Sequence, residues 1–325
     1  MSCILVINAG TTNVRVSLLD AAWNELATAS DPSGVRYTAI DGHNGRLKDG
    51  IRQCVRSVLG TQGITAESVS ACYAYGMITS AGGLLEVPHL VAPANAEAFR
   101  AGLVTRAFPE LLPCPITFLP GLRNTRERAT PENLDTLDMM RGEETEALGL
   151  WSLMQPEKDM LLVLPGSHNK VISLSADGTL RGSMTSISGE LLDAVTHHTI
   201  LAESVEHGFT DAEHYDREQV LAGARACAGG FGHAAFEARL MRTLGSGTAD
   251  DARSFLLGAV LQLDVEAIRH FSFFSPEQVL MVAGKAPFGQ ALVDLFTQEG
   301  WQARLIDEEL RRRMGIAGVR TILGV

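Results

Sequence analysis

The stretch VINAGTTNVRVSLLD, residues 6–20, decides the fold more than any other part of the sequence. Apolar residues lead to Asn8, and the sequence GTTN at positions 10–13 then interrupts them. Apolar and polar side chains alternate over the following residues 14–18. This pattern predicts two strands that are joined by a tight turn.

A second stretch with the same pattern lies in the other half of the chain. Residues 159–186 are DMLLVLPGSHNKVISLSADGTLRGSMTS, with the turn GSHN at positions 166–169. Both turns have glycine first, a hydroxyl residue second and asparagine fourth. Such a repeat predicts a duplicated architecture. The alternative is chance, because the match is short.

Length and composition limit the class of protein. A chain of 325 residues exceeds the usual size of one hydrophobic core, so we expect two domains. The net charge of −11 argues against a nucleic-acid-binding surface, which needs clustered lysine and arginine. The five cysteines form no CxxC pair and suit a reducing, cytoplasmic compartment. We expect neither a signal peptide nor a membrane-spanning segment.

The remaining elements follow from periodicity and from turn residues. Strands are expected near residues 3–8, 13–19, 23–30 and 69–76, and residues 115–124 predict a strand and a turn. Helices are expected near residues 46–59, 94–108, 142–154, 189–202, 215–228, 233–244 and 250–270. Residues 277–300 predict a strand, a glycine turn and a helix, and a strand and a helix close the chain. The polar stretch 120–137 is expected to be a loop or a lid.

Three glycine turns are candidates for binding phosphate or nucleotide. The turns at 10–13 and 166–169 can point successive backbone amides into one concavity, and their hydroxyls add further donors. The third turn, VAGKA at 282–286, lies between a buried strand and a helix. Each turn alone is also explained by ordinary turn chemistry. The sequence contains neither GxGxxG nor GxxxxGK[ST], so a dinucleotide or P-loop fold lacks its motif.

The segment MRGEETEALG, residues 140–149, places Glu143 and Glu144 at the start of an apolar-faced helix. One interpretation is that these carboxylates complement the helix dipole. The other is that one of them is a general base for a substrate hydroxyl. Gly189-Glu190 at another helix start allows the same two interpretations. No cysteine and histidine spacing indicates a structural metal site.

Seven motifs together resemble the 2-keto-3-deoxygalactonokinase family of the sugar kinase, actin and heat-shock ATPase superfamily. In chain order they are INAGTTNVR, GMITSAGGLLEVPHLVAPA, LPGLRN, MRGEETEALG, LPGSHNKV, SISGELLDAVTHHTILA and VAG. MRGEET and PGSHNK are specific to the family, whereas GTTN is shared across the superfamily. The resemblance covers roughly residues 3–320, and residues 203–275 carry no motif that we recognise.

The resemblance implies an α/β fold of two ribonuclease-H-like, actin-like ATPase domains, each built on a mixed βββαβαβα sheet, with an interdomain cleft. The expected division is 1–140 for the first domain with its sugar-acid loops, 141–158 for a connecting helix, and 159–325 for the second domain. The implied reaction transfers the γ-phosphoryl group of ATP to the 6-hydroxyl of 2-keto-3-deoxy-D-galactonate, in galactonate catabolism, with Mg²⁺. The expected partners are therefore ATP and a sugar acid, without nucleic acid or membrane, and a homodimer is a family-level expectation.

Position by position, the resemblance also implies roles for single residues. Phosphate contacts are expected from Gly10, Thr11, Thr12, Asn13, Gly166, Ser167, His168 and Lys170. The adenosine turn is expected at Gly284 and Lys285. The expected catalytic base is Glu143, with Glu144 as second choice. Sugar-acid contacts are expected from Arg15, Gly34, Val35, Gly76 and Met77.

Two positions depart from the superfamily pattern. Many members have aspartate where this chain has Asn8, the expected metal position, and the loss of a charge predicts weaker Mg²⁺ binding. Lys285 replaces a small hydroxyl residue and is expected either to contact phosphate or to narrow the pocket. Two alternatives therefore stay open. One is a kinase for another 2-keto-3-deoxy sugar acid, such as 2-keto-3-deoxygluconate, and the other is a catalytically weak sugar-acid sensor.

Overall fold

The computed structural model describes residues 2–325. The chain forms two compact units. Unit 1 holds the residues up to Gln155 together with Asp177–Leu180 and Arg313–Val325. Unit 2 holds Pro156–Ala176 and Arg181–Arg312.

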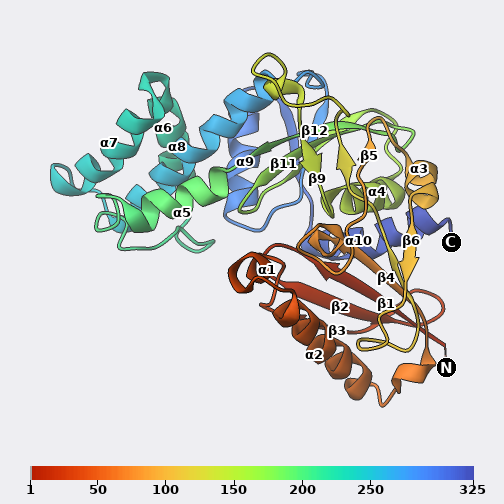
Figure 1. The fold of residues 1–325 in the computed structure, drawn as a ribbon. Helices are drawn as coiled ribbons and strands as arrows, with labels where there is room; N and C mark the ends of the chain where they lie inside the picture. Colours follow the sequence, from red (N-terminus) through yellow and green to blue (C-terminus); the bar gives the residue numbers. More distant parts are fainter. Residues whose placement is uncertain (1) are drawn as a thin grey trace. The chain divides into compact units, whose positions relative to one another are not determined.

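Unit 1 is built on a six-stranded mixed sheet with the order β3-β2-β1-β4-β7-β6 (Figure 1). Its strands are β1 (Cys3–Ala9), β2 (Val14–Leu19), β3 (Glu25–Asp31), β4 (Val69–Gly76), β6 (Val104–Arg106) and β7 (Ile116–Phe118). β1 pairs antiparallel with β2 and parallel with β4. The hairpin that the sequence predicts around positions 10–13 is therefore confirmed.

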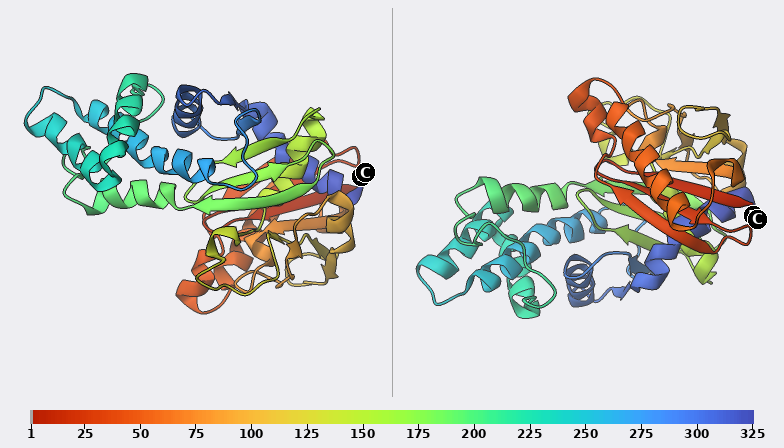
Figure 2. Two further views of the ribbon diagram at one scale, coloured as in Figure 1. Left: turned by 90° about the horizontal axis from the view of Figure 1, so that it is seen from above. Right: turned by 90° about the horizontal axis from the view of Figure 1, so that it is seen from below.

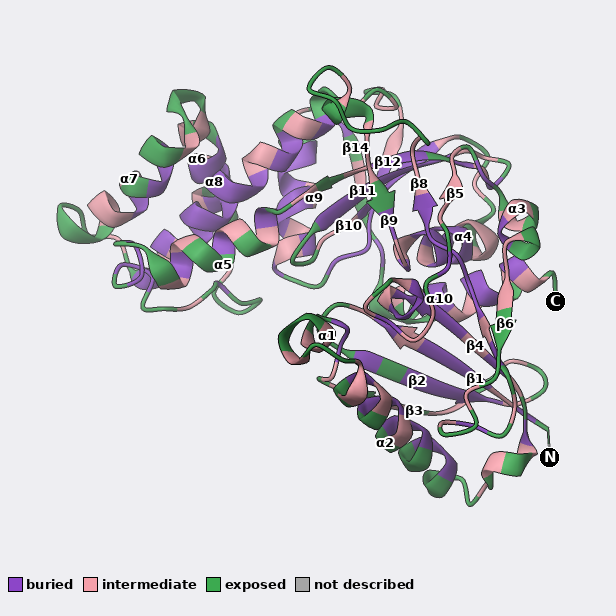
Figure 3. Ribbon diagram, viewed as in Figure 1, coloured by how far each residue is buried: buried purple, intermediate pink, exposed green. Residues whose placement is uncertain are grey.

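Helix α2 (Gly45–Thr61) packs against strands β2 and β3. Its buried side chains recur every three or four residues, at Leu47, Ile51, Cys54, Val55, Val58 and Leu59. Figure 3 shows this buried stripe facing the sheet, with exposed residues on the opposite side of the helix. A short helix that the sequence analysis does not predict, α1 (Arg36–Asp41), lies between β3 and α2.

A smaller sheet, β5-β8-β9, completes the strands of unit 1. Its strands are β5 (Leu90–Val91), β8 (Leu122–Arg123) and β9 (Met139–Met140). The helix expected over residues 94–108 is wrong in extent, because α3 (Ala96–Ala101) begins after the capping residue Asn95 and ends at Gly102. The expected loop 120–137 contains β8 and the short 3-10 helix η3 (Leu134–Thr136).

Helices α4 (Glu143–Met154) and α10 (Glu308–Leu323) meet through glycines. A Cβ atom on Gly149 would overlap the Met314 carbonyl, and one on Gly318 would overlap the Thr145 carbonyl. This close packing explains why α4 and the chain from Arg313 onward belong to unit 1. The division differs from the expected one, which gave residues 141–158 to a connecting helix and all later residues to the second domain.

Unit 2 is built on a five-stranded sheet with the order β12-β11-β10-β13-β14. The strands are β10 (Met160–Leu164), β11 (Asn169–Leu174), β12 (Leu180–Ser186), β13 (Val279–Val282) and β14 (Gln302–Leu305). β10 pairs antiparallel with β11 and parallel with β13. The order of strands repeats that of β3-β2-β1-β4-β7 in unit 1, so the predicted duplication is confirmed at the level of topology.

Unit 2 has four α-helices between β12 and β13, and a fifth α-helix follows β13. They are α5 (Ser188–His198), α6 (Arg217–Ala226), α7 (Phe231–Thr243), α8 (Ala249–Arg269) and α9 (Phe288–Gln298). Figure 2 shows α5, α6 and α7 grouped around α8, whose inner positions are buried along most of its length. A capping box between Thr248 and Asp251 fixes the start of α8. Within residues 2–325 no helix combines the length and apolar character that a membrane span requires.

Candidate functional site

The first glycine turn, residues 10–13, is held from one side by residues 34–36. The carbonyls of Thr12, Gly10 and Thr11 accept hydrogen bonds of 2.9, 3.0 and 3.0 Å from the amides of Gly34, Val35 and Arg36. Within residues 2–325 no protein group accepts a hydrogen bond from the Thr11 or Thr12 amide. The carbonyls of Gly10, Thr11 and Thr12 and the amide of Gly10 are therefore used within the chain, whereas the amides of Thr11 and Thr12 have no protein acceptor over residues 2–325.

Gly34 is required for this contact. A Cβ atom at this position would overlap the Thr12 and Thr11 backbone, so only glycine allows the two segments to approach. Val35 beside it is buried. Both residues were expected to contact the sugar acid, whereas their contacts within the chain support the turn, and a contact with a sugar acid stays a prediction.

Asn8 lies at the carboxyl end of β1, beside the end of β4. Its Nδ2 atom donates a hydrogen bond of 3.0 Å to the hydroxyl of Tyr75. Gly76 follows with a φ of +89°, and a Cβ there would lie 3.1 Å from Asn8 Oδ1 and 2.8 Å from the Ala9 carbonyl. The tyrosine therefore fixes the amide of Asn8, and glycine at position 76 leaves room for its oxygen. Arg15 lies opposite Asn8 across the hairpin.

The start of helix α4 lies at the same end of the sheet. Gly142 has a φ of +114°, and a Cβ on it would lie 3.2 Å from the Cα of Gly76. This contact of two glycines brings the following residue, Glu143, close to the end of β4. The structure thus places Gly142, the residue before Glu143, against Gly76, which in turn lies beside Asn8. Met77 is half-buried and begins the short helix η2 (Met77–Thr79).

The two glutamates at this helix start have different environments. Glu144 is buried, and both of its oxygens accept hydrogen bonds from the Gly142 amide, at 2.8 and 2.9 Å. Burial, and next the charge of Glu143, raise the pKa of Glu144 to about 8. Glu143 is only partly buried, and its Oε2 accepts a hydrogen bond of 3.1 Å from the Arg141 amide. Both carboxylates therefore hold the helix start, and Glu143 is the more accessible of the two.

Sequence reasoning did not single out Arg141. Its side chain reaches from this helix start to residues 79–89 of the same unit. Its guanidinium donates hydrogen bonds of 2.8 Å to the Thr79 hydroxyl, 2.8 Å to the Val87 carbonyl and 3.3 Å to His89 Nδ1. The Thr79 hydroxyl in turn donates to the Gly76 carbonyl at 2.9 Å. A continuous network therefore links the end of β4 to Arg141 and His89.

The second glycine turn, residues 166–169, is held from within unit 2. The Gly166 amide donates a hydrogen bond of 2.9 Å to Asn169 Oδ1, and the Ser167 carbonyl accepts one of 3.0 Å from the Glu190 amide. A Cβ on Gly189 would overlap the Gly166 carbonyl. Here too a glycine segment packs against the turn, as Gly34 does in unit 1. Ser167 and His168 are exposed at the tip.

Asp264 of helix α8 anchors this second turn. Its carboxylate accepts hydrogen bonds from Asn169 Nδ2 and from the hydroxyls of Ser186 and Ser188. Burial raises the pKa of Asp264, against the effect of these three donors. Sequence reasoning missed Asp264, although one signal was available. Leu261, Asp264, Val265 and Ile268 share the buried stripe of α8, and an aspartate on such a stripe needs partners.

Two further predicted residues of the second turn have protein partners. His168 Nε2 lies 3.1 Å from Glu190 Oε1. The buried Lys170 donates a hydrogen bond to the Thr185 hydroxyl on the neighbouring strand β12. Both side chains therefore lie next to the turn.

The third glycine turn follows β13, next to the second turn. A Cβ on Gly284 would overlap Pro165 Cγ and would lie 2.9 Å from the Cα of Gly289. The Ala283 amide donates a hydrogen bond of 2.8 Å to the Val163 carbonyl, which continues the pairing of β13 with β10. Lys285 is exposed. The structure thus brings Gly284 and the turn at 166–169 together within unit 2.

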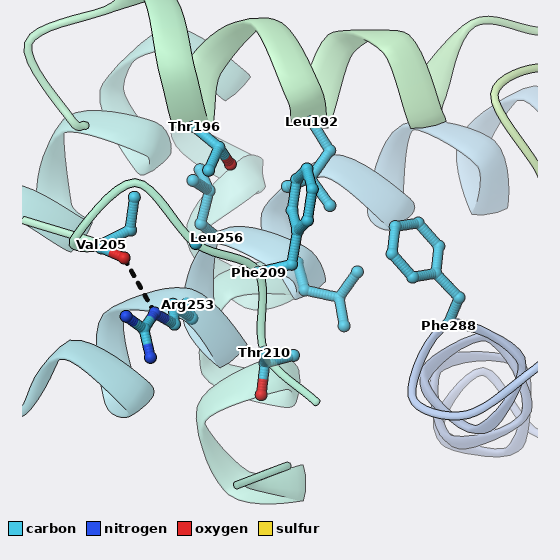
Figure 4. A pocket seen from close by; sticks show the side chains of 10 residues that line it. Leu192, Thr196, Val205, Phe209, Thr210, Arg253, Leu256 and Phe288 are labelled. Atoms are coloured by element: carbon cyan, nitrogen blue, oxygen red, sulfur yellow. Dashed lines mark hydrogen bonds between the residues drawn. The ribbon is translucent and has the colours of Figure 1, made fainter. Parts of the chain in front are cut away.

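A pocket elsewhere in unit 2 contains none of the predicted site residues. It is lined mainly by apolar side chains, among them Leu192, Leu256 and Phe288 (Figure 4). Its one charged side chain, Arg253, already donates hydrogen bonds of 2.8 Å to the Val205 carbonyl and 2.7 Å to Asp250. This arrangement resembles a packing defect between helices more than a site for a charged ligand.

The side chains that could hold a metal ion are few. Over residues 2–325 no group of three or more histidine, cysteine, aspartate and glutamate side chains has a suitable arrangement. Mg²⁺ in nucleotide-dependent enzymes is usually held by one or two protein oxygens together with phosphates and water. The oxygen of Asn8 suits that kind of site, and an all-protein metal cage does not fit these residues.

A family model and a curated protein that match the sequence point to the same family. The model of a family described as 2-keto-3-deoxy-galactonokinase matches residues 8–321. A curated protein of Rhizobium meliloti (strain 1021), named "Probable 2-dehydro-3-deoxygalactonokinase DgoK1", is 30% identical over 251 residues, which cover 74% of this chain and 75% of that protein. The family resemblance of the motifs is therefore confirmed.

Solved structures show the same fold. A crystal structure of a candidate 2-dehydro-3-deoxygalactonokinase from Sinorhizobium meliloti is 24% identical, covers 100% of both chains and has a TM-score of 0.76. The activator of the 2-hydroxyisocaproyl-CoA dehydratase from Clostridium difficile, with bound ADPNP, is 12% identical, with coverage of 98% of this chain and 94% of that chain and a TM-score of 0.52. The fold is thus the actin-like ATPase fold, as expected from the sequence.

Proposed function

Because the chain belongs to the 2-keto-3-deoxy-galactonokinase family, we propose that it transfers the γ-phosphoryl group of ATP to the 6-hydroxyl of 2-keto-3-deoxy-D-galactonate. The observation that carries this proposal is the position of Glu143. Its helix start touches Gly76, which lies against Asn8 at the end of the strand that leads into the first glycine turn. The proposed base and the turn proposed to bind phosphate therefore share one end of the sheet.

Glu143 is proposed as the general base. It accepts the proton of the substrate hydroxyl while that oxygen forms a bond to the γ-phosphorus, and the bond from phosphorus to the bridging oxygen breaks to release ADP. The hydrogen bond from the Arg141 amide keeps the carboxylate of Glu143 at the helix start. Glu144, whose pKa is raised to about 8, holds the turn and does not compete for this role.

The two glycine turns are proposed to bind the phosphates of ATP. In the first turn the amides of Thr11 and Thr12 and the exposed Asn13 are the donors. In the second turn Gly166, Ser167 and His168 are exposed, and Lys170 adds a positive charge beside them. Gly284 and Lys285 are proposed to contact the adenosine part of the nucleotide.

Mg²⁺ bound to ATP would neutralise phosphate charge, and Asn8 is proposed to contribute to its binding through the side-chain oxygen. That oxygen lies beside Gly76, where no side chain covers it from that position. Contacts with the sugar acid are proposed for Arg15, Gly76 and Met77, which surround the same strand ends, and for the turn-supporting residues Gly34 and Val35. A cytoplasmic location and a homodimer belong to the proposal as well, and cell fractionation and light scattering would test them.

The experiment that tests this function measures ADP formation with a panel of acids, with and without Mg²⁺. The panel holds 2-keto-3-deoxygalactonate and 2-keto-3-deoxygluconate, together with the uncharged carboxamide of each acid. We expect the highest kcat/KM with 2-keto-3-deoxygalactonate. Turnover with 2-keto-3-deoxygluconate alone would reassign the substrate. Binding of an acid without any turnover would instead favour a sensor.

A further inference from the structure

The small sheet β5-β8-β9 of unit 1 gathers basic side chains on one face (Figure 3 shows its strands). Leu122 of β8 pairs with Leu90 of β5 and with Met140 of β9. The neighbouring positions of this register place His89 and Arg141 on either side of Gly121. The hydrogen bond of 2.9 Å from the Leu90 amide to the Gly121 carbonyl supports that alignment.

Gly121 separates these two side chains. A Cβ atom on it would lie 2.7 Å from Arg141 Cγ and 2.8 Å from His89 Cδ2. Both side chains therefore lie over the face toward which a side chain at position 121 would point. Arg123, in β8, is two residues beyond Gly121, so the alternation of an extended chain places it on that face. Arg141 and His89 thus flank a position that only glycine leaves open, and Arg123 follows on the same face.

Arg141 and His89 are fixed by their partners. The guanidinium of Arg141 donates to Thr79, to the Val87 carbonyl and to His89 Nδ1. Because arginine has no acceptor, Nδ1 of His89 accepts this bond and Nε2 carries the hydrogen. His89 can therefore offer one N–H donor from Nε2, and Arg141 retains N–H groups beyond the three that it uses.

Arg123 differs from Arg141 because it lacks protein acceptors. Its Nε atom is buried and has no hydrogen-bond partner. No ion pair involving Arg123 or Arg141 occurs over residues 2–325. The carboxylates that act on Arg141 from a greater distance are Glu144 and Glu86, and burial raises the pKa of Glu144 to about 8. A buried donor without a partner is costly, which indicates that an acceptor is missing.

We propose that Arg123, Arg141 and His89 form the subsite that binds the carboxylate of the sugar acid. This inference rests on the proposed function. A carboxylate accepts two parallel hydrogen bonds from the N–H groups of one arginine, and no protein acceptor occupies the Nη atoms of Arg123 over residues 2–325. His89 Nε2 and the remaining N–H groups of Arg141 supply the other donors.

The position of Arg141 agrees with the shape of the substrate. Its backbone amide holds Glu143, and its side chain runs away from that residue toward His89. A six-carbon acid has its carboxylate and its terminal hydroxyl at opposite ends of the molecule. The subsite therefore binds the acid end, while Glu143 faces the hydroxyl that receives the phosphoryl group.

The first test compares Arg123→Gln with the wild type. We expect KM for 2-keto-3-deoxygalactonate to rise at least tenfold, while kcat and KM for ATP change less than twofold. Arg123→Lys keeps the positive charge but cannot donate two parallel hydrogen bonds. Its KM for the acid should therefore lie between those of the wild type and Arg123→Gln. Arg106→Gln is the matched control, because Arg106 is exposed on strand β6 and loses the same charge. An unchanged KM for the acid in Arg123→Gln overturns the proposal.

The second test changes the ligand instead of the protein. The wild type should bind the acid at least tenfold more tightly than the corresponding carboxamide, and Arg123→Gln should lose most of that preference. If the variant weakens acid and carboxamide equally, Arg123 supports the structure and does not read the carboxylate. That result would also overturn the proposal.

A third measurement does not depend on turnover. Burial, and then the charges of Arg141 and Arg123, lower the pKa of His89 to about 4. A bound carboxylate should raise it, which an NMR titration of the His89 ring with the acid in the absence of ATP would detect. A wild type that phosphorylates no acid refutes the proposed function. An active wild type whose His89 does not respond to the acid refutes this inference alone.

Discussion

The side-chain amide of Asn169 joins two parts of unit 2 that are 95 positions apart in the sequence. Its nitrogen donates to the buried carboxylate of Asp264, and its oxygen accepts a hydrogen bond from the Gly166 amide. Asn169 thus transmits the position of helix α8 to the second glycine turn. The hydroxyls of Ser186 and Ser188 hold the same carboxylate from strand β12 and helix α5.

Replacement of this anchor should weaken nucleotide binding in particular. Asp264→Asn removes one acceptor oxygen, so that one of the three donors loses its partner and the turn loosens. We expect KM for ATP to rise about tenfold, which corresponds to about 1.4 kcal/mol, and KM for the sugar acid to change less than twofold. Glu266→Gln, two residues along the same helix and exposed, is the control. Equal losses for both substrates would indicate a general defect in folding instead.

The proposed catalytic base gives a second prediction. Glu143→Gln keeps the size of the side chain and its hydrogen-bond acceptor for the Arg141 amide, but it cannot take up a proton. We expect kcat to fall about 10²-fold or more, with ATP binding retained in calorimetry. Glu97→Gln, exposed in the first turn of α3, is the control for a lost carboxylate. Nearly intact turnover in Glu143→Gln would show that another group accepts the proton.

The sequence was sufficient for those features that depend on local patterns. The hairpins around residues 10–13 and 166–169 were predictable because apolar alternation and turn residues lie next to each other in the chain. The helix start at Glu143 was predictable for the same reason. Helix α1 was not predictable, because it has six residues and none of them is buried. The helix over residues 94–108 was overextended because its apolar spacing continues past Gly102, where the helix ends.

The parts of the site that depend on distant pairs could not be derived in this way. The need for glycine at position 34 arises from its approach to Thr12, which no local pattern indicates. The clustering of His89 with Arg141 depends on the pairing of two-residue strands. Such strands are too short to give a periodic signal. Family resemblance alone assigned some roles, such as a sugar-acid contact for Val35. It does not distinguish a residue that supports a turn from a residue that contacts a ligand.

Asn8 gives a third prediction, which concerns the metal. Asn8→Asp restores a carboxylate at the end of β1, where the Tyr75 hydroxyl can donate a hydrogen bond to it. We expect the free Mg²⁺ concentration for half-maximal rate, at saturating ATP, to fall severalfold, because carboxylates bind Mg²⁺ more strongly than amides. Asn95→Asp is the control, since aspartate caps helix α3 as well as asparagine does. An unchanged Mg²⁺ requirement would place the metal away from position 8.

Glu144 gives a fourth prediction, on stability against pH. Its pKa is about 8 in the folded chain against an ordinary value of 4.5, so folding favours the protonated form. Its contribution to stability is therefore fully present below about pH 4.5 and is lost as the pH rises to about 8. The free energy of unfolding should decrease by about 1.4 kcal/mol per pH unit in that range.

Glu144→Gln isolates this contribution, because glutamine stays neutral and its oxygen can still accept the hydrogen bond from the Gly142 amide. Urea unfolding from pH 5 to pH 8, followed by the fluorescence of the three tryptophans, of which Trp151 lies on the same helix, should show a smaller pH dependence in the variant than in the wild type. The variant should gain stability relative to the wild type as the pH rises. If both proteins lose stability in parallel, Glu144 is ionised in the folded state, and its burial must then be offset by a cation near the start of α4.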